Sequence, residues 1–422
     1  MSTYLCFNIP QSGNVNPTLA IVQGLITRGE YVTYYLTREF QRPIEATGAL
    51  FRSYTSNLDF SAIITAMSSK SSTERFLMLS ESMLHESRAI LPQILNDLQG
   101  WRPDGIIYGQ SALWGRMLAQ ILHVPAISVR SSYATNQYFH LFSPLLPAVN
   151  PLEAERVKQR QDSLNRQLHS LCREYHIPTF DFTDIFSHAE PLTLVTMPRA
   201  FQYAGNTFDN RFKFVGPCIL PRHDNSGFAL ERLGNHPILY ISLGTSFNQQ
   251  PDFYQTCLKA FANTPWQVVM SIGTHVTPAE LEPIPENFII RPYVPQLDIL
   301  SRTSIFISHG GMNSTMEALS YGVPLIIIPR IQEHELTARR VVELGLGMEL
   351  EPENVTAESL REAVNTIAHQ PEIRMRTRQM QRTIAETGGV HAAVDAILQY
   401  LHTRRHSGSP LDCAQFTSET LS

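Results

Sequence analysis

The sequence of 422 residues lacks the features that mark several large classes of protein. No apolar run approaches the about 18–20 residues of a membrane-spanning helix, and the strongest run covers only Val323–Pro329. The first residues show no basic segment followed by an apolar core and a small-residue cleavage site, which disfavours a signal peptide. We therefore expect a cytoplasmic protein without stable membrane insertion.

Patterns that bind disulfides, metals or nicotinamide cofactors are also missing. The five cysteines are odd in number and scattered, and no CxxC pair occurs, so neither a disulfide framework nor a cysteine metal site is expected. The fifteen histidines form no HxxH or HExxH pattern, and no GxGxxG fingerprint is present. With 33 basic and 38 acidic residues, the net charge of −5 disfavours nucleic acid as the main partner.

What the sequence contains is two successive series of alternating strand-like and helix-like segments. The first series opens with an apolar run at 4–9, a turn-rich stretch at 10–17, an amphipathic segment at 18–27 and a β-rich run at 31–36. Its further strands are expected at 105–108, 124–129 and 192–196. In the second series, strands are expected at 237–243, 266–272, 288–291, 304–308 and 324–328. This alternation predicts an α/β fold with parallel sheets covered by helices.

The composition also indicates where the chain divides. A polar, turn-rich stretch at 221–227 is interpreted as the linker between two Rossmann-like halves. From about 404 the sequence turns polar, which is typical of a disordered tail. The expected units are a domain at 1–220, a domain at 221–384, a helix at 385–403 and a tail at 404–422.

The densest cluster of ligand-binding residue types follows the strand expected to end near 308. Gly310 and Gly311 let the backbone turn sharply and approach a ligand, and a helix is expected to start at 313–315. The free N–H groups and the dipole of a helix start favour a phosphate, and His309 adds a donor. Glu317, about one turn into the helix, is placed to accept hydrogen bonds from ribose hydroxyls. A plain strand–turn–helix with a capping residue would carry the same residues without a ligand.

Four segments share their order and spacing with a known signature. They are Arg291-Pro-Tyr-Val-Pro-Gln296, His309-Gly-Gly-Met-Asn-Ser-Thr-Met-Glu317, Gly322-Val-Pro324 and Glu343-Leu-Gly-Leu-Gly347. Together they resemble the nucleotide-sugar signature of the UDP-glycosyltransferase superfamily (family 1 glycosyltransferases), and most of all its bacterial macrolide-glycosyltransferase branch. The resemblance implies a GT-B fold, in which two Rossmann-like domains face each other across a cleft and the last helix crosses back to the first domain.

The resemblance also implies roles for individual residues of this chain. The residues that it assigns to the diphosphate or to the loop beside it are Gly244, Thr245, His309, Gly311, Asn313 and Ser314. Those that it assigns to the nucleoside are Tyr293, Val294, Gln296 and Glu317. No metal or other cofactor is expected, because the family does not normally require one.

Two positions depart from the family on the acceptor side. The family's first loop carries a His that acts as general base, but Asn14 stands there, and an amide cannot accept a proton near neutral pH. The acid that orients this His follows a strand around 104–108, and Gly109 stands at its position in this chain. Loss of the His base and of the acid together is more readily explained than loss of one, because nothing requires the orienting acid once the base is gone.

Three explanations of the missing base remain open. An amine, thiol, phosphate, carboxylate or acidic phenol acceptor would need no strong base, since general-base help is worth about 10²–10⁴-fold. A substitute base would be sought among His85, His140 and Glu86. Alternatively, transfer has been lost, which would leave a nucleotide-sugar-binding or partner protein.

The sugar and acceptor sites show further particular features. After Pro329 the family usually has an acid followed by Gln, whereas this chain has Glu333 followed by His334. This change indicates a sugar other than plain glucose, unless His334 only caps the helix that follows. The apolar residues considered for an acceptor pocket, which are equally typical of core, are Phe60, Met67, Phe76, Met78, Met83, Tyr138, Phe139 and Phe142.

These residues predict an inverting glycosyltransferase. Its expected partners are a UDP- or dTDP-sugar donor and an apolar small-molecule acceptor of natural-product type. Nucleic acid is not expected as a partner, and a homodimer is left open.

Overall fold

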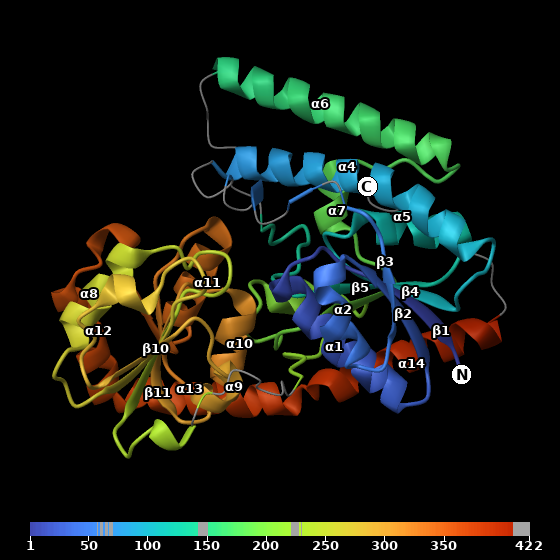
Figure 1. Cartoon of the computed structure of the whole chain (residues 1–422). Coiled ribbons are helices and arrows are strands. Elements are labelled where there is room, and N and C mark those ends of the chain that lie inside the picture. Colours follow the sequence, from blue (N-terminus) through green and yellow to red (C-terminus); the bar gives the residue numbers. More distant parts are fainter. Residues whose placement is uncertain are drawn as a thin grey trace.

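The structure is a computed structural model that describes residues 1–56, 58–59, 62–63, 66, 71–141, 151–220, 228 and 230–407. In this part of the chain, two parallel sheets, each covered by helices, form two lobes that lie side by side (Figure 1). The predicted α/β fold of two Rossmann-like domains is therefore confirmed. The predicted linker at 221–227 lies outside the described residues.

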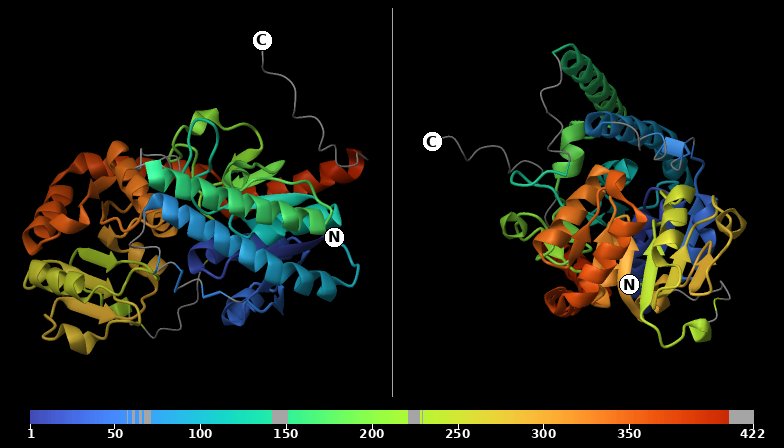
Figure 2. Two further views of the ribbon diagram at one scale, coloured as in Figure 1. Left: turned by 90° about the horizontal axis from the view of Figure 1, so that it is seen from above. Right: turned by 90° about the vertical axis from the view of Figure 1, so that its left-hand side faces the viewer.

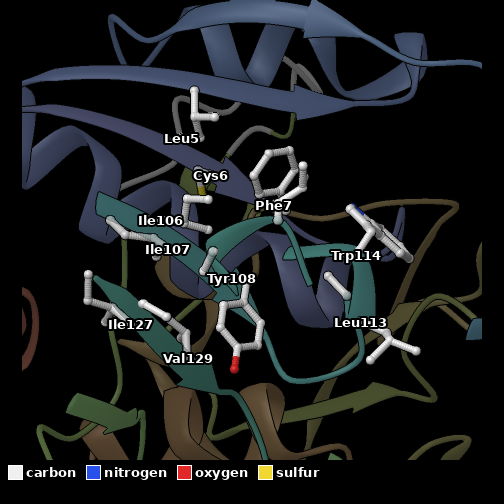
Figure 3. Close-up of a cluster of buried hydrophobic side chains, with 14 of the residues drawn as sticks. Leu5, Cys6, Phe7, Ile106, Ile107, Tyr108, Leu113, Trp114, Ile127 and Val129 are labelled. Atoms are coloured by element: carbon white, nitrogen blue, oxygen red, sulfur yellow. The ribbon is translucent and has the colours of Figure 1, made fainter. Parts of the chain in front are cut away.

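The N-terminal sheet has seven parallel strands in the order β3-β2-β1-β4-β5-β6-β7. They are β1 (Thr3–Phe7), β2 (Tyr31–Leu36), β3 (Leu50–Ser53), β4 (Gly105–Gly109), β5 (Ala126–Arg130), β6 (Leu192–Val195) and β7 (Phe212–Phe214). The central strands β4 and β5 are buried on both faces, as unbroken apolar runs predict. Figure 3 shows side chains of β1, β4 and β5, among them Phe7, Tyr108 and Val129, gathered with Trp114 in this core. The edge strands β3 and β7 were not predicted, because neither carries a long apolar run.

Helices cover both faces of this sheet. They are α1 (Ser12–Thr27), α2 (Gln41–Glu45), α4 (Ser72–Leu98), α5 (Leu113–Leu122), α6 (Pro151–Glu174) and α7 (Phe182–Ser187). Helix α1 begins at Ser12, within the stretch predicted to be a turn, so Asn14 lies in its first turn. Pro17 lies inside the helix and has no N–H, which leaves the carbonyl of Gly13 without its intrahelical donor.

The C-terminal sheet has six parallel strands in the order β10-β9-β8-β11-β12-β13. They are β8 (Ile238–Ser242), β9 (Gln267–Ser271), β10 (Phe288–Arg291), β11 (Thr303–Ser308), β12 (Leu325–Ile327) and β13 (Gly347–Glu349). Its helices are α8 (Pro251–Phe261), α9 (Gln296–Leu300), α10 (Met312–Ser320), α11 (Gln332–Glu343), α12 (Ala357–His369) and α13 (Pro371–Glu386). Within the described residues, no helix is long and apolar enough to cross a membrane.

The two domains pack directly against each other. Tyr133 and Phe201 of the N-terminal domain share one hydrophobic cluster with Met316 and Ala338 of the C-terminal domain. From α11, Arg340 Nε donates to the carbonyl of Phe201 at 3.0 Å. The loops at the carboxyl ends of the two sheets are thereby held close together, and the left-hand view of Figure 2, from above, shows the two lobes side by side.

The last helix, α14 (Gly389–Ser407), leaves the C-terminal domain and runs along the N-terminal one (Figure 1). Two ion pairs, Arg28–Asp395 and Arg405–Asp104, hold it there, each with 2.6 Å between the guanidinium nitrogen and the carboxylate oxygen. The helix includes residues 404–407, which were predicted to belong to a disordered tail. It extends this far because Arg405 pairs with Asp104 of the N-terminal domain. Residues 408–422 lie outside the described part of the chain.

Candidate functional site

Helix α10 begins at the carboxyl end of β11 without a capping side chain. Gly310 has a φ of +90°, and Gly311 occupies the N-cap position with no side-chain hydrogen bond to the first turn. The first N–H groups of the helix therefore have no partner from a capping side chain, and they form the positive end of the helix dipole. Asn313 and Ser314 lie in this turn. Such a helix start can hold a phosphate group.

His309 lies between two glycines at this helix start. A Cβ atom on Gly244 would lie 2.5 Å from its Cε1, and a Cβ atom on Gly311 would lie 2.5 Å from its Nε2, so only glycine fits at either position. Burial, followed by the charge of Arg330, lowers the pKa of His309 to about 4. The ring is therefore neutral near pH 7 and donates one N–H. Thr245 is exposed on the same loop.

His334 packs edge-on against His309, with ring centroids 4.7 Å apart and an interplanar angle of 89°. The ring of Phe247 makes a T-shaped contact with that of His334, with the two ring centroids 5.3 Å apart. Burial comes first, followed by repulsion from the His309 ring when it is protonated and from Arg330, and together they hold the pKa of His334 well below its usual range. The N-cap of α11 is Ile331, without a side-chain cap, so His334 is not the helix cap considered from the sequence.

Gln296 links Glu317 to the neighbouring strand. Its Nε2 donates to Glu317 Oε2 at 2.6 Å, and its Oε1 accepts from the hydroxyl of Tyr240 at 3.0 Å. Glu317 is buried, and its position one turn into α10 agrees with the spacing in the sequence. Tyr293 is 53% exposed beyond the end of β10, beside the half-buried Val294, so its ring face is open to a planar ligand.

Two hydrogen bonds cross between the domains at this site. Asn313 Nδ2 donates to the carbonyl of Gly13 at 2.8 Å, and Ser132 Oγ donates to Glu333 Oε1 at 2.8 Å. The Gly13 carbonyl is available because Pro17 offers no N–H to it. Burial raises the pKa of Glu333, and the hydrogen bond from Ser132 opposes this rise. Residues proposed for the donor thus already contact the opposite domain.

Gly109 is the last residue of β4, Asn14 lies in the first turn after the adjacent strand β1, and the side chain of Asn8 contacts both. Asn8 Nδ2 donates to the carbonyl of Asn14 at 2.8 Å. A Cβ atom on Gly109 would clash with the side-chain amide of Asn8, so Asn8 fills the space that a side chain at 109 would need. The side chain of Asn14 accepts from Ser131 Oγ at 3.2 Å and donates to Gln11 Oε1 at 3.2 Å.

A cavity of about 640 Å³ adjoins this site between the domains. The residues that line it include Asn16, Pro17, Arg42, Ile219, Asn313 and Glu317. Its volume is within the range of small-molecule sites. Among the residues that the structure describes, no group of three or more His, Cys, Asp or Glu side chains is arranged to hold a metal ion.

The residues considered for an acceptor pocket fall in different places. Phe60, Met67 and Phe142 lie outside the described residues. Phe76 and Met83 are fully buried in the N-terminal core, which is the alternative weighed for them, and Met78 is half-buried. Tyr138 is exposed, and Phe139 stacks on Tyr203 with centroids 5.3 Å apart.

The three candidate substitute bases are also separated. His85 is exposed in a groove between α4 and α6, on the outer side of the N-terminal domain. His140 is half-buried, and burial lowers its pKa. Glu86 is fully buried on the inner face of α4.

Sequence reasoning did not select Ser132, Asn8 or Tyr240. Ser132 follows β5 and Asn8 follows β1, and ligands bind at the carboxyl ends of parallel strands. This rule about strand ends is the signal in the sequence that points to Ser132 and Asn8. No motif marks these residues, and the partners of Ser132 and Tyr240 are distant in the sequence.

Known proteins resemble this chain over nearly its whole length. Residues 255–390 match the family model of the erythromycin biosynthesis protein CIII-like C-terminal domain. The NDP-glycosyltransferase YjiC of Bacillus licheniformis is 40% identical, over 94% of this chain and 96% of that protein. The demethyllactenocin mycarosyltransferase of Streptomyces fradiae is 33% identical, over 93% of this chain and 85% of that protein. The crystal structure of CalG4, the calicheamicin glycosyltransferase, is similar with a TM-score of 0.81 at 31% identity, over 95% of this chain and 98% of that one.

These similarities extend through both domains, so they concern the whole architecture and not only the helix start at α10. They confirm the family and the GT-B fold that the four sequence segments predict. The chain belongs to the UDP-glycosyltransferase superfamily, in its macrolide-glycosyltransferase-like branch, and is a glycosyltransferase.

Proposed function

We propose that this glycosyltransferase moves a sugar from a UDP- or dTDP-sugar to a small-molecule natural product, with inversion at the anomeric carbon. The observation that carries the proposal is the uncapped start of α10 beside a neutral His309 and a buried Glu317. It supplies N–H donors for a diphosphate and, about one turn away, a carboxylate for ribose hydroxyls. Relatives named as an NDP-glycosyltransferase and as a mycarosyltransferase support it.

The donor is held by groups of distinct chemistry. The first turn of α10, with Asn313 and Ser314, binds the diphosphate and stabilises the negative charge that builds as the sugar leaves. The neutral ring of His309 donates one N–H to the same anion. Glu317, oriented by Gln296 at 2.6 Å, accepts the ribose hydroxyls. The open face of Tyr293 stacks on the base.

The sugar lies beside Glu333 and His334. Glu333 is held by Ser132 across the cleft, so its second oxygen is left to accept from a sugar hydroxyl. His334 has an Nδ1 atom without a hydrogen-bond partner in the described part of the chain. A neutral imidazole at this position offers one donor and one acceptor, a pattern that discriminates among sugars by their hydroxyl orientations.

The acceptor reaches the anomeric carbon from the N-terminal domain, past Asn14. A single displacement from the face opposite the diphosphate inverts the configuration at this carbon. Asn14 does not remove a proton, so the acceptor needs a group that is acidic or nucleophilic without base assistance. The outward position of His85 favours this explanation over a substitute base at that residue.

The rival function is nucleotide-sugar binding without transfer, which the pair Asn14 and Gly109 favours. The purified protein is incubated with UDP- and dTDP-sugars and with amine, thiol, carboxylate and phenol acceptors, and products are sought as a mass gain of one hexosyl or deoxyhexosyl unit. Nucleotide binding is measured in parallel by calorimetry. Tight binding without a product from any pair would overturn the proposed transfer and support the rival.

A further inference from the structure

Asn14 and Gln110 carry amide side chains just after two paired parallel strands, at the carboxyl edge of the N-terminal sheet. Gln110 directly follows β4, and Asn14 lies in the first turn after β1, the strand that pairs with β4. Both side chains are half-buried. We refer to Asn14 and Gln110 as the amide pair. Its hydrogen bonds determine which end of each amide a ligand meets.

Arg130 orients the amide of Gln110. Its Nη1 donates to Gln110 Oε1 at 2.9 Å and to the carbonyl of Phe186 at 2.9 Å, and its Nη2 donates to the carbonyl of His188 at 2.5 Å. A guanidinium group has donors only, so the oxygen end of Gln110 must face it. The amide nitrogen of Gln110 then points away from Arg130, and it makes no hydrogen bond within the described residues.

The amide of Asn14 is held in the same sense. Its oxygen accepts from Ser131 Oγ at 3.2 Å, and its nitrogen donates to Gln11 Oε1 at 3.2 Å, which leaves a second N–H. The amide pair therefore offers N–H donors to a ligand, while each amide oxygen already accepts one hydrogen bond from the protein. A general base needs the opposite arrangement, because it must offer a lone pair to a hydroxyl proton.

The charge behind the amide pair is positive. Arg130 is 2% exposed, and burial lowers its pKa to about 10, so it remains charged near pH 7. The other charged groups beside it are Arg116, whose Nε and Nη1 have no hydrogen-bond partner in the described residues, and Glu190. Burial alone would raise the pKa of Glu190, but hydrogen bonds from His188 and Tyr108 hold it below its usual value. Two cations thus face one carboxylate.

We propose that the reacting group of the acceptor is a carboxylate, which the N–H groups of the amide pair hold and which the buried cations favour. This inference rests on the proposed transfer function and narrows its acceptor class. A carboxylate oxygen forms the bond to the anomeric carbon while the bond from that carbon to the diphosphate oxygen breaks. The electron pair leaves with the nucleoside diphosphate, and the product is a sugar ester. No proton has to be removed, so no base is needed.

Glu86 supplies the rival mechanism on this side of the cleft. Glu86 is fully buried. Burial raises the pKa of Tyr54 most, and the charge of Glu86 raises it further. The hydroxyl of Tyr54 donates to the carbonyl of Asn8 at 3.3 Å. A hydroxyl acceptor would require Glu86, or a group like it, to accept its proton. An ammonium acceptor would in addition be repelled by Arg130.

The decisive comparison uses three acceptors of the same shape: cinnamate, cinnamyl alcohol and cinnamylamine. Each is incubated with UDP-glucose, dTDP-glucose and dTDP-rhamnose, and ester products are recognised by cleavage with hydroxylamine. We expect kcat/KM for cinnamate to exceed that for the alcohol and the amine by about 10-fold or more. Faster transfer to the alcohol or the amine overturns the carboxylate inference alone. No product with any acceptor, despite nucleotide binding, overturns the proposed function as well.

Two variants separate the amide pair from the rival base. Gln110→Glu keeps the shape, neutralises Arg130 and replaces the outward N–H donors with an oxygen, so we expect kcat/KM for cinnamate to fall about 10–100-fold while UDP affinity is unchanged. Gln167→Glu is the matched control, because Gln167 accepts from Arg88 at 3.5 Å on the outer surface. Unchanged cinnamate transfer in Gln110→Glu contradicts the inference. Loss of cinnamate transfer in Glu86→Gln also contradicts it, because a carboxylate needs no base.

Discussion

Asn313 of the C-terminal domain donates a 2.8 Å hydrogen bond to the carbonyl of Gly13 in the N-terminal domain. The bond exists because Pro17, four positions after Gly13, has no N–H to close the helical turn. A proline inside α1 thus exposes an acceptor that a side chain from the other domain uses. Together with the bond between Ser132 and Glu333, it joins the two faces of the cleft.

Removing these two bonds should weaken the ligand-free protein. We expect the double variant Ser132→Ala/Asn313→Ala to lose about 1–3 kcal/mol of unfolding free energy, at about 0.5–1.5 kcal/mol for each net hydrogen bond. Urea denaturation without nucleotide measures this loss. Ser187→Ala is the control, because the one hydrogen bond of the Ser187 hydroxyl within the described residues goes to Thr183 of its own helix at 3.1 Å. A double variant as stable as the control would show that the bonds are not made in solution.

Asn8 and Gly109 should behave as a coupled pair. A Cβ atom at 109 meets the amide of Asn8, so Gly109→Ala should lower stability by about 1–3 kcal/mol, as overpacking does. In an Asn8→Ala background the same change should be tolerated, and a double-mutant cycle measures the difference. Gly13→Ala is the control, since a Cβ atom there meets nothing within 4 Å. Strictly additive effects would contradict the contact.

Glu317 is expected to determine nucleotide affinity. Glu317→Ala should weaken UDP or dTDP binding about 10–100-fold, because a hydrogen bond to a charged group is worth about 1.5–3 kcal/mol. Titration calorimetry with each nucleotide gives the dissociation constants. Glu386→Ala, an exposed position at the end of α13, should bind like the wild type. Unchanged affinity in Glu317→Ala would remove the ribose role.

His309 should make stability depend on pH. Its folded pKa of about 4 lies below its unfolded value near 6.5, so its contribution is complete above pH 6.5 and is lost as pH falls toward 4. The loss is at most about 3.5 kcal/mol, at roughly 1.4 kcal/mol for each pKa unit. Unfolding free energies at pH 7 and pH 4.5 should differ less in His309→Asn than in wild type. The exposed control His391→Asn should keep the wild-type difference, and the same pH slope in both variants would refute the assignment.

The local backbone around His309 could be predicted from the sequence. The strand end, the glycine turn and the helix start at 309–317 are contiguous, so local backbone chemistry alone specifies how they fold. The need for glycine at 244 has a different origin, because it follows only once the fold places His309 beside it. The absence of a base at Asn14 is likewise a property of the sequence, since no arrangement makes an amide accept a proton.

The tertiary structure alone decided what surrounds Asn14. Ser132 meets Glu333, and Arg130 meets Gln110, because the sheet order and the packing of the domains bring together residues far apart in the chain. No local periodicity encodes such pairs, and each alone reads as an ordinary residue after a strand. The sequence therefore determined that position 14 carries an amide, which cannot act as a base, whereas the meeting of strand ends decided that the buried Arg130 holds the amide oxygen of Gln110.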